Sequence, residues 1–247
     1  MNINKFSKGK NGMYTISLEN NTKLTIHEDL ILKYDLLLTK EIDDSLKEKI
    51  IEENKVYEIY EVSISYITKK LRSKKELNNY LIKKGYEQDL VDKVIELLSK
   101  EGYLNDKVYA TSYVHDRIAL SIDGPNKIRN DLTNLGISND LIEESIISYT
   151  EDIEKERIEK LINKQIKSNN NKGANLLKKK IQMYLLNLGY NYELINDNLN
   201  KKQLSNPDIY QKEYNKIYKT LSSRYSGKEL EYRVAQKLYQ KGFIKED

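Results

Sequence analysis

The chain has 247 residues, 38% of them hydrophobic and 32% charged, and its 42 basic and 38 acidic residues give a net charge of +4. It contains no cysteine, which excludes disulfides and thiolate metal sites, and no apolar run close to the roughly 18 residues of a membrane span. A mean hydropathy of −0.73 favours an elongated helical protein over one deep core, and the start lacks the apolar run of a signal peptide, so we expect a cytoplasmic protein.

The first part of the sequence predicts two short strands. Met13–Leu18 and Lys23–His27 alternate apolar and polar residues, and the Asn20-Asn21 pair lies between them. A single hairpin is marginal in water, so we expect it to pack on a short helix in residues 27–37, with a second helix over 43–54. Residues 1–54 therefore form a separate amino-terminal region.

From residue 55 the pattern is helical and repeats. Four glycines, at 85, 136, 189 and 242, are separated by 51, 53 and 53 residues, and each follows an amphipathic helix that it is expected to end in the left-handed conformation. Apolar residues recur eight and four positions before each glycine. They are Leu77, Ile128, Ile181 and Val234, and then Leu81, Leu132, Leu185 and Leu238. A fixed period of this size predicts a tandem helical array.

Each repeat is expected to hold three helices. First helices are predicted over 55–71, 106–120, 152–167 and 208–224, a glycine-ended helix follows each, and third helices lie over 89–100, 140–149 and 193–199. The repeats are then 55–105, 106–150, 151–200 and 201–247, the last without its third helix, with flexible joints at 168–173 and 200–208. The predicted fold is mainly α: a small β-hairpin region followed by tandem three-helix repeats in an elongated, curved array.

Local signals support these helix starts. Ser73 with Glu76, and again Ser226 with Glu229, have the spacing of a capping box. The Gly124-Pro125 pair places proline at the first position of a helix, where its missing N–H costs nothing.

The sequence offers little for catalysis. Of the two histidines, His27 ends a predicted strand and His115 lies inside a helix, and neither has the spacing of a zinc site. No glycine-rich phosphate loop is present. We therefore expect a protein without enzymatic activity, metal or cofactor.

Basic residues gather at comparable places in successive repeats. The candidate partner- or DNA-binding residues are Lys69, Lys70, Arg72, Lys74, Lys75, Lys83, Lys84, Lys127, Arg129, Lys178, Lys179 and Lys180. One interpretation is a basic stripe along a phosphate backbone or an acidic groove; the other is cations that solvate helix ends. Four tyrosines that could stack on bases occupy core registers, so we expect them to pack: Tyr80, Tyr86, Tyr184 and Tyr190.

Two of the repeats resemble those of the RecX family of regulatory proteins. In the first repeat the shared residues are Arg72-Ser73, Glu76-Leu77, Lys84-Gly85 and Gly102 to Asp106, with Asn105 in place of an acid. In the second they are Gly124, Pro125, Ile128, Leu132, Gly136 and Ile137. The third repeat fits more loosely, and the resemblance weakens after Asn200.

This resemblance implies a partner and a function. Members of the family bind the filament that the RecA recombinase forms on single-stranded DNA, lie in its groove, and lower RecA ATPase, strand exchange and co-protease activity. We expect the chain to act on RecA in this way as a monomer, without a membrane. Two alternatives remain open: a helix-turn-helix DNA-binding regulator, and a helical-repeat scaffold unrelated to RecA.

Overall fold

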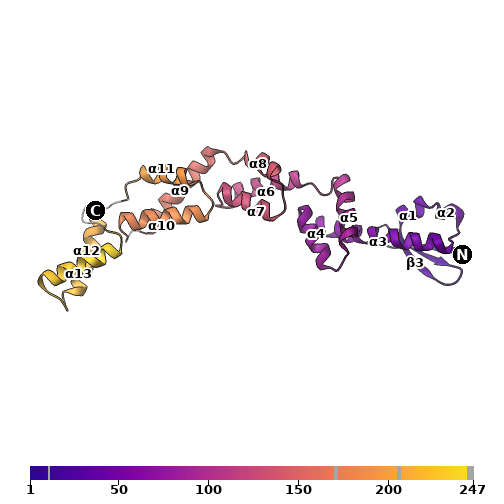
Figure 1. The fold of residues 1–247 in the computed structure, drawn as a ribbon, viewed down its shortest axis with the longest axis horizontal. Helices are drawn as coiled ribbons and strands as arrows, with labels where there is room; N and C mark the ends of the chain where they lie inside the picture. The colour runs from indigo at the N-terminus through magenta and orange to yellow at the C-terminus, as the bar shows by residue number, and fades with distance from the viewer. Residues whose placement is uncertain (11, 170–171, 205–206, 244–247) are drawn as a thin grey trace. The chain divides into compact units, whose positions relative to one another are not determined.

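The computed structural model describes residues 1–10, 12–169, 172–204 and 207–243 (Figure 1). Its strands are β1 (Ile3–Lys8), β2 (Met13–Leu18) and β3 (Lys23–His27). Its helices are α1 (Glu28–Lys33), α2 (Leu36–Thr39), α3 (Asp44–Ile67), α4 (Lys74–Lys83), α5 (Gln88–Lys100), α6 (Asp106–Leu120), α7 (Pro125–Asn134), α8 (Asn139–Ile146), α9 (Glu151–Ser168), α10 (Ala174–Asn187), α11 (Tyr192–Asn200), α12 (Pro207–Leu221) and α13 (Gly227–Gln240).

The chain divides into two compact units. One is made of Met1–Tyr109 with Leu135–Ile137, and the other of Ala110–Asn134 with Ser138–Asp247. The first unit contains the sheet and the first repeat, each with its own apolar cluster. The second unit contains separate clusters for the third and fourth repeats. The mainly helical fold with a small amino-terminal sheet is confirmed.

The predicted hairpin forms the central strand and one edge strand of a three-stranded antiparallel sheet in the order β1-β2-β3. The turn at Asn20-Asn21 is confirmed, because Asn21 adopts a φ of 64°. The strand β1 was missed by the sequence analysis. Ile3 and Phe6 both pack on the sheet's core although they are three residues apart, since the register shifts between Ile3 and Lys5 and breaks the simple alternation.

One long helix replaces two predicted ones. We expected helices over 43–54 and 55–71, but α3 runs without a break through Asn54. The Asn54 side chain accepts a hydrogen bond from the His27 amide at 2.9 Å and donates one to the Thr25 carbonyl at 3.0 Å. These bonds tie α3 to β3, so Ile50 packs in the sheet's core while Ile59 packs in the first repeat.

The predicted repeat is confirmed by its glycine corners. Gly85, Gly136, Gly189 and Gly242 end α4, α7, α10 and α13 with φ values of 92°, 84°, 85° and 84°. At three of these corners the residue after the glycine donates back into the helix, as Tyr190 does to the Leu185 carbonyl at 3.2 Å. The residues eight and four positions before each glycine are all buried, which confirms the predicted core register.

The two predicted capping boxes have different outcomes. Ser73 and Glu76 form the reciprocal pair of hydrogen bonds. The second box is wrong: Ser226 begins α13, but its side chain makes no capping hydrogen bond. Gly227, the first residue of α13, adopts a φ of 60°, so this helix begins on a glycine in the left-handed conformation. Parts of the predicted joints, residues 170–171 and 205–206, lie outside the described residues, as does Ile244 at the end of the fourth repeat.

Candidate interaction surface

The start of α4 is a hydrogen-bonded hub built from the first repeat's motif residues. The Glu76 carboxylate accepts hydrogen bonds at 3.1 Å from the Ser73 amide and from the Arg72 guanidinium. Burial alone would raise the pKa of Glu76, but these donors and the Tyr109 hydroxyl outweigh it and hold the pKa below its ordinary value. The Arg72 guanidinium also lies 4.4 Å from the ring centre of Tyr66, so it interacts mainly with groups of the protein itself.

This hub also holds residues 135–137, which belong to the same compact unit. The Ser73 hydroxyl donates to the Leu135 carbonyl at 2.8 Å, next to the Gly136 corner. A Cβ added to Gly136 would lie 2.7 Å from the Cβ of Lys75. The aliphatic part of Lys75 therefore packs on the glycine corner of the following repeat, which requires glycine there for space as well as for its φ.

The same relation recurs between the second and third repeats. The Gly124 amide donates to the Leu188 carbonyl at 2.7 Å, and the Asn126 amide donates to the Gly189 carbonyl at 3.0 Å. Between the third and fourth repeats, the Gly173 amide donates to the Lys241 carbonyl at 2.9 Å. The start of one repeat's glycine-ended helix thus lies against the glycine corner of the next repeat each time.

A second set of bonds holds the end of α6 and the segment after it, one from the second repeat itself and the others from the third repeat. The Tyr190 hydroxyl donates to the Ile122 carbonyl at 2.9 Å, and the Tyr149 hydroxyl to the Asp123 carbonyl at 3.1 Å. The Arg157 guanidinium donates to the carbonyls of Ser121 and Ile118. Burial raises the pKa of Tyr190, so its hydroxyl stays a donor at all ordinary pH values.

Several predicted contact residues are paired within the protein. Arg72 pairs with Glu76, as described above, and the Lys127 ammonium lies 2.5 Å from the buried Asp123 carboxylate. Arg129 makes two hydrogen bonds to the Glu143 carboxylate, at 2.8 and 3.2 Å. The ammonium groups of two others hydrogen-bond to amide oxygens, Lys178 to Asn200 and Lys180 to Asn169.

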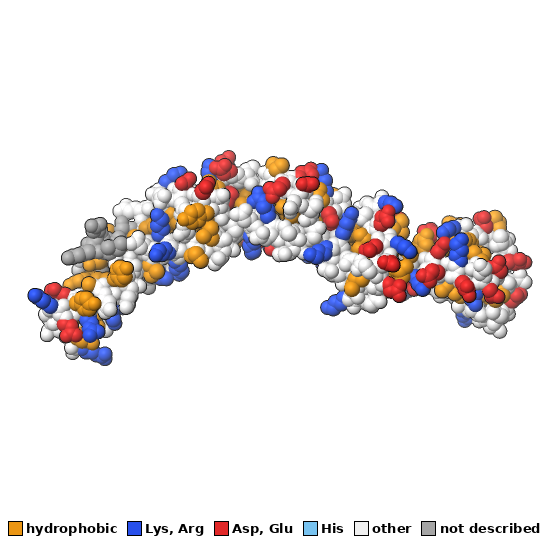
Figure 2. Space-filling view, viewed as in Figure 1, with side chains coloured by type: hydrophobic (Ala, Val, Ile, Leu, Met, Phe, Trp, Pro, Cys, Tyr) orange, Lys and Arg blue, Asp and Glu red, His pale blue; other side chains and the backbone are white. Residues whose placement is uncertain are grey.

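The remaining predicted cations are less engaged. Lys84 lies over the ring of Tyr80, with its ammonium 5.3 Å from the ring centre. Like Lys84, six others have no acid within ion-pair distance among the residues that the structure describes: Lys69, Lys70, Lys74, Lys75, Lys83 and Lys179. Figure 2 shows basic and acidic side chains interspersed over the visible face of each unit. The cations therefore form separate small clusters.

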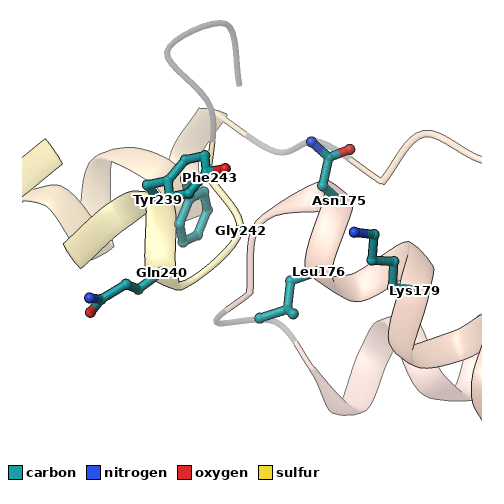
Figure 3. A pocket seen from close by; sticks show the side chains of 7 residues that line it. All are labelled: Asn175, Leu176, Lys179, Tyr239, Gln240, Gly242 and Phe243. Carbon is teal, nitrogen blue, oxygen red and sulfur yellow. The ribbon is translucent and has the colours of Figure 1, made fainter. Parts of the chain in front are cut away.

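Three of the four tyrosines in predicted core registers are half-buried, and Tyr190 is fully buried. Sequence reasoning missed the exposed aromatic surface of the fourth repeat. The ring of Tyr239 is 76% exposed and lines a pocket of about 490 Å³ (Figure 3). The sequence carries only a weak signal for it: Tyr239 lies outside the core register of four and eight positions before Gly242.

The described residues contain neither a metal-binding cluster nor a membrane-spanning helix. Within the described ranges, no cluster of three or more histidine or acidic side chains could hold a metal ion. No described helix is both long enough and apolar enough to pass through a bilayer.

The fold and its junctions define a tandem three-helix repeat protein with small clusters of exposed cations. The profile of the first three-helix domain of RecX matches residues 60–98, and that of the second matches residues 105–146. A regulatory protein RecX from Streptococcus uberis is 30% identical to this chain, over 100% of it and 96% of the relative. One from Bacillus mycoides is 30% identical over 89% of this chain and 83% of the relative. The chain therefore belongs to the RecX family of regulatory proteins.

Solved structures agree with this assignment. A crystal structure of a regulatory protein RecX superposes with a TM-score of 0.72 at 22% identity, covering 79% of this chain and 98% of that one. The crystal structure of RecX from Lactobacillus salivarius gives a TM-score of 0.55 at 27% identity, covering 59% and 95%. The tandem helical fold is thus shared with both.

Proposed function

We propose that this chain binds the RecA filament on single-stranded DNA, lies in the filament groove, and inhibits RecA. The observation that carries the proposal is family membership along the whole chain, since the Streptococcus uberis relative is matched over 100% of it. RecA ATPase, strand exchange and co-protease activity would all fall, because each needs an intact filament. The protein would act in the cytoplasm, as a monomer and without catalytic chemistry of its own.

The mechanism is steric and electrostatic. Successive repeats would lie between neighbouring RecA protomers, and their cations would compete for DNA phosphates or acidic protein side chains. One exposed lysine contributes little and is screened by salt, but contacts on tethered repeats act together through effective concentration. A series of repeats therefore suits a periodic target such as a filament.

The proposed contacts are the twelve basic residues predicted from the sequence. Whether each one already forms an ion pair within the protein determines how available its charge is to a partner. Lys69, Lys70, Lys74, Lys83 and Lys179 have the charge most available to a partner, because no described acid neutralises it. Arg72, Lys127 and Arg129 would contribute mainly by holding their helices in place.

A sequence-specific DNA-binding function has less support. The third helices of the first two repeats carry Asp89, Asp92 and Glu143, where a recognition helix needs side chains that read base edges. No contact in the described residues favours major-groove readout over filament binding.

The test is the DNA-dependent ATPase of the cognate RecA. Adding the protein after filaments have formed should lower the hydrolysis rate in proportion to its concentration, until the filament sites are filled. An unchanged rate, together with no protein retained on the filament, would reject the proposal.

A further inference from the structure

The pocket between α10 and the end of α13 carries the chemistry of a nucleotide site. Figure 3 shows Tyr239 and Gln240 on one wall and Asn175, Leu176 and Lys179 on the other. The pocket volume is about 490 Å³, which is within the usual range for small ligands. All of its lining residues belong to the second unit.

The backbone around this pocket is tightly held. The Gly173 amide donates to the Lys241 carbonyl at 2.9 Å, and glycine at 173 and at 242 lets the two segments approach closely. Phe243 is buried, with its ring edge-on to Tyr210 at 5.8 Å. The walls are therefore pre-organised, which lowers the entropic cost of binding.

The side chains offer three complementary contacts. The Tyr239 ring, 76% exposed, presents a flat face to solvent. The Asn175 amide makes no hydrogen bond to another described side chain, so it can pair with a base edge, whereas the Gln240 side chain points away from α10 (Figure 3). Lys179 has no described acidic partner and can meet a phosphate. Aromatic stacking beside a cation is the usual basis of single-strand binding.

This pocket differs in charge from the equivalent pocket between the second and third repeats. The pocket between the second and third repeats is lined by three acids, Glu151, Glu154 and Glu193, and by one cation, Arg129, so its net charge disfavours a polyanion. Among the residues that the structure describes, no acid lines the pocket at Tyr239.

We propose that this pocket binds one nucleotide of single-stranded DNA, with its base stacked on Tyr239 and its phosphate at Lys179. The inference rests on the proposed filament function and adds to it a direct contact between the fourth repeat and the DNA strand. A duplex does not fit the same site, because its bases are stacked on each other and have no free face.

The absence of tryptophan from the chain permits a direct test. Tyr239→Trp places one indole in the pocket, and Tyr232→Trp places one on the same helix outside it, where Tyr232 is 68% exposed. Excited at a wavelength that tyrosine does not absorb, the 239 variant should be quenched saturably by a thymidine oligonucleotide. The 232 variant should change little, and an abasic oligonucleotide of equal length should quench neither.

Affinity gives a second readout. By fluorescence anisotropy with a labelled thymidine oligonucleotide, Tyr239→Ala should weaken binding about fivefold or more, and Tyr232→Ala should leave it unchanged. Equal quenching in both tryptophan variants, quenching by the abasic strand, or equal effects of the two alanines would overturn the proposal. RecA is absent from these assays, so their failure leaves filament inhibition standing; conversely, quenching at position 239 without any effect on RecA ATPase would reject only the filament function.

Discussion

Gly124 and Gly189 meet backbone to backbone: a Cβ added to Gly124 would lie 2.6 Å from the carbonyl carbon of Gly189. The two glycines lie 65 positions apart in the chain and belong to different repeats. The second repeat's glycine-ended helix thus begins on the corner that ends the third repeat's equivalent helix. Glycine is required at the corner twice over, for its left-handed φ and for the neighbour that approaches it.

We predict that alanine destabilises the protein more at a glycine corner that a neighbouring repeat contacts than at one that is free of contacts. Gly189→Ala should lower the free energy of unfolding more than Gly85→Ala, by about 1–3 kcal/mol. Both have a positive φ, but a Cβ at 189 would meet the Lys127 backbone whereas nothing lies within 4 Å of one at 85. Urea unfolding followed by helix circular dichroism measures both variants. Equal losses would show that the corners do not support the neighbouring repeat.

Two serines at equivalent helix starts should differ in the same way. Ser73→Ala removes the capping bond to the Glu76 amide and the bond to the Leu135 carbonyl, so we expect about 1–2 kcal/mol of destabilisation. Ser226→Ala is the matched control, since its side chain makes no capping bond, and should be close to neutral. Thermal unfolding of the two variants compares them. A larger loss at 226 would contradict this account of the helix starts.

The half-buried Glu76 and the buried Glu154 should change the free energy of unfolding with pH in opposite directions. The folded-state pKa of Glu76 lies below its ordinary 4.5, so the stability that it contributes above pH 4.5 is lost as pH falls. Burial raises the pKa of Glu154 above 4.5, so its stabilising contribution is present at low pH and lost as pH rises through the raised value.

Glutamine variants of the two acids test both directions of this pH dependence. At pH 7, Glu76→Gln should destabilise the protein and Glu154→Gln should stabilise it. The Glu154 difference should shrink as pH falls through its raised pKa, and the Glu76 difference only below pH 4.5, as pH falls through its lowered pKa. Denaturant unfolding at four or five pH values is sufficient. Differences that are constant with pH would mean that neither carboxylate's charge matters.

The exposed cations predict the salt dependence of filament binding. Replacing Lys69, Lys70 and Lys83 by glutamine should weaken binding to the RecA filament and lower the slope of log affinity against log salt by roughly one per lost contact. The control replaces three lysines that pair with acids: Lys33, Lys55 and Lys155. It makes the same change in net charge. Equal losses in both triple variants would show that only net charge matters.

The repeat could be predicted from the sequence because its signal is redundant. Each glycine corner was marked by its φ requirement and by buried residues at fixed offsets, such as Ile181 and Leu185 before Gly189. The strand β1 was missed because a register shift after Ile3 hides its alternation. The break predicted at Asn54 was wrong because two hydrogen bonds to the sheet hold this asparagine inside a helix.

The candidate contact residues illustrate a different limit. The sequence marks Arg72 and Lys70 as equal cations two positions apart. In the fold, the Arg72 guanidinium pairs with Glu76 and stacks on Tyr66, whereas Lys70 is exposed. Which cations are neutralised depends on contacts across helices, and residue type and spacing do not encode these directly. The motif that identifies the family thus lies largely at a junction between repeats.

Co-sedimentation with preformed RecA filaments on single-stranded DNA tests the central claim most directly. The account predicts that the protein pellets with the filament at a fixed ratio to RecA protomers, and that the triple variant of Lys69, Lys70 and Lys83 is retained less as salt rises. Protein that stays in the supernatant with the filament, at low salt and at saturating concentration, would contradict it.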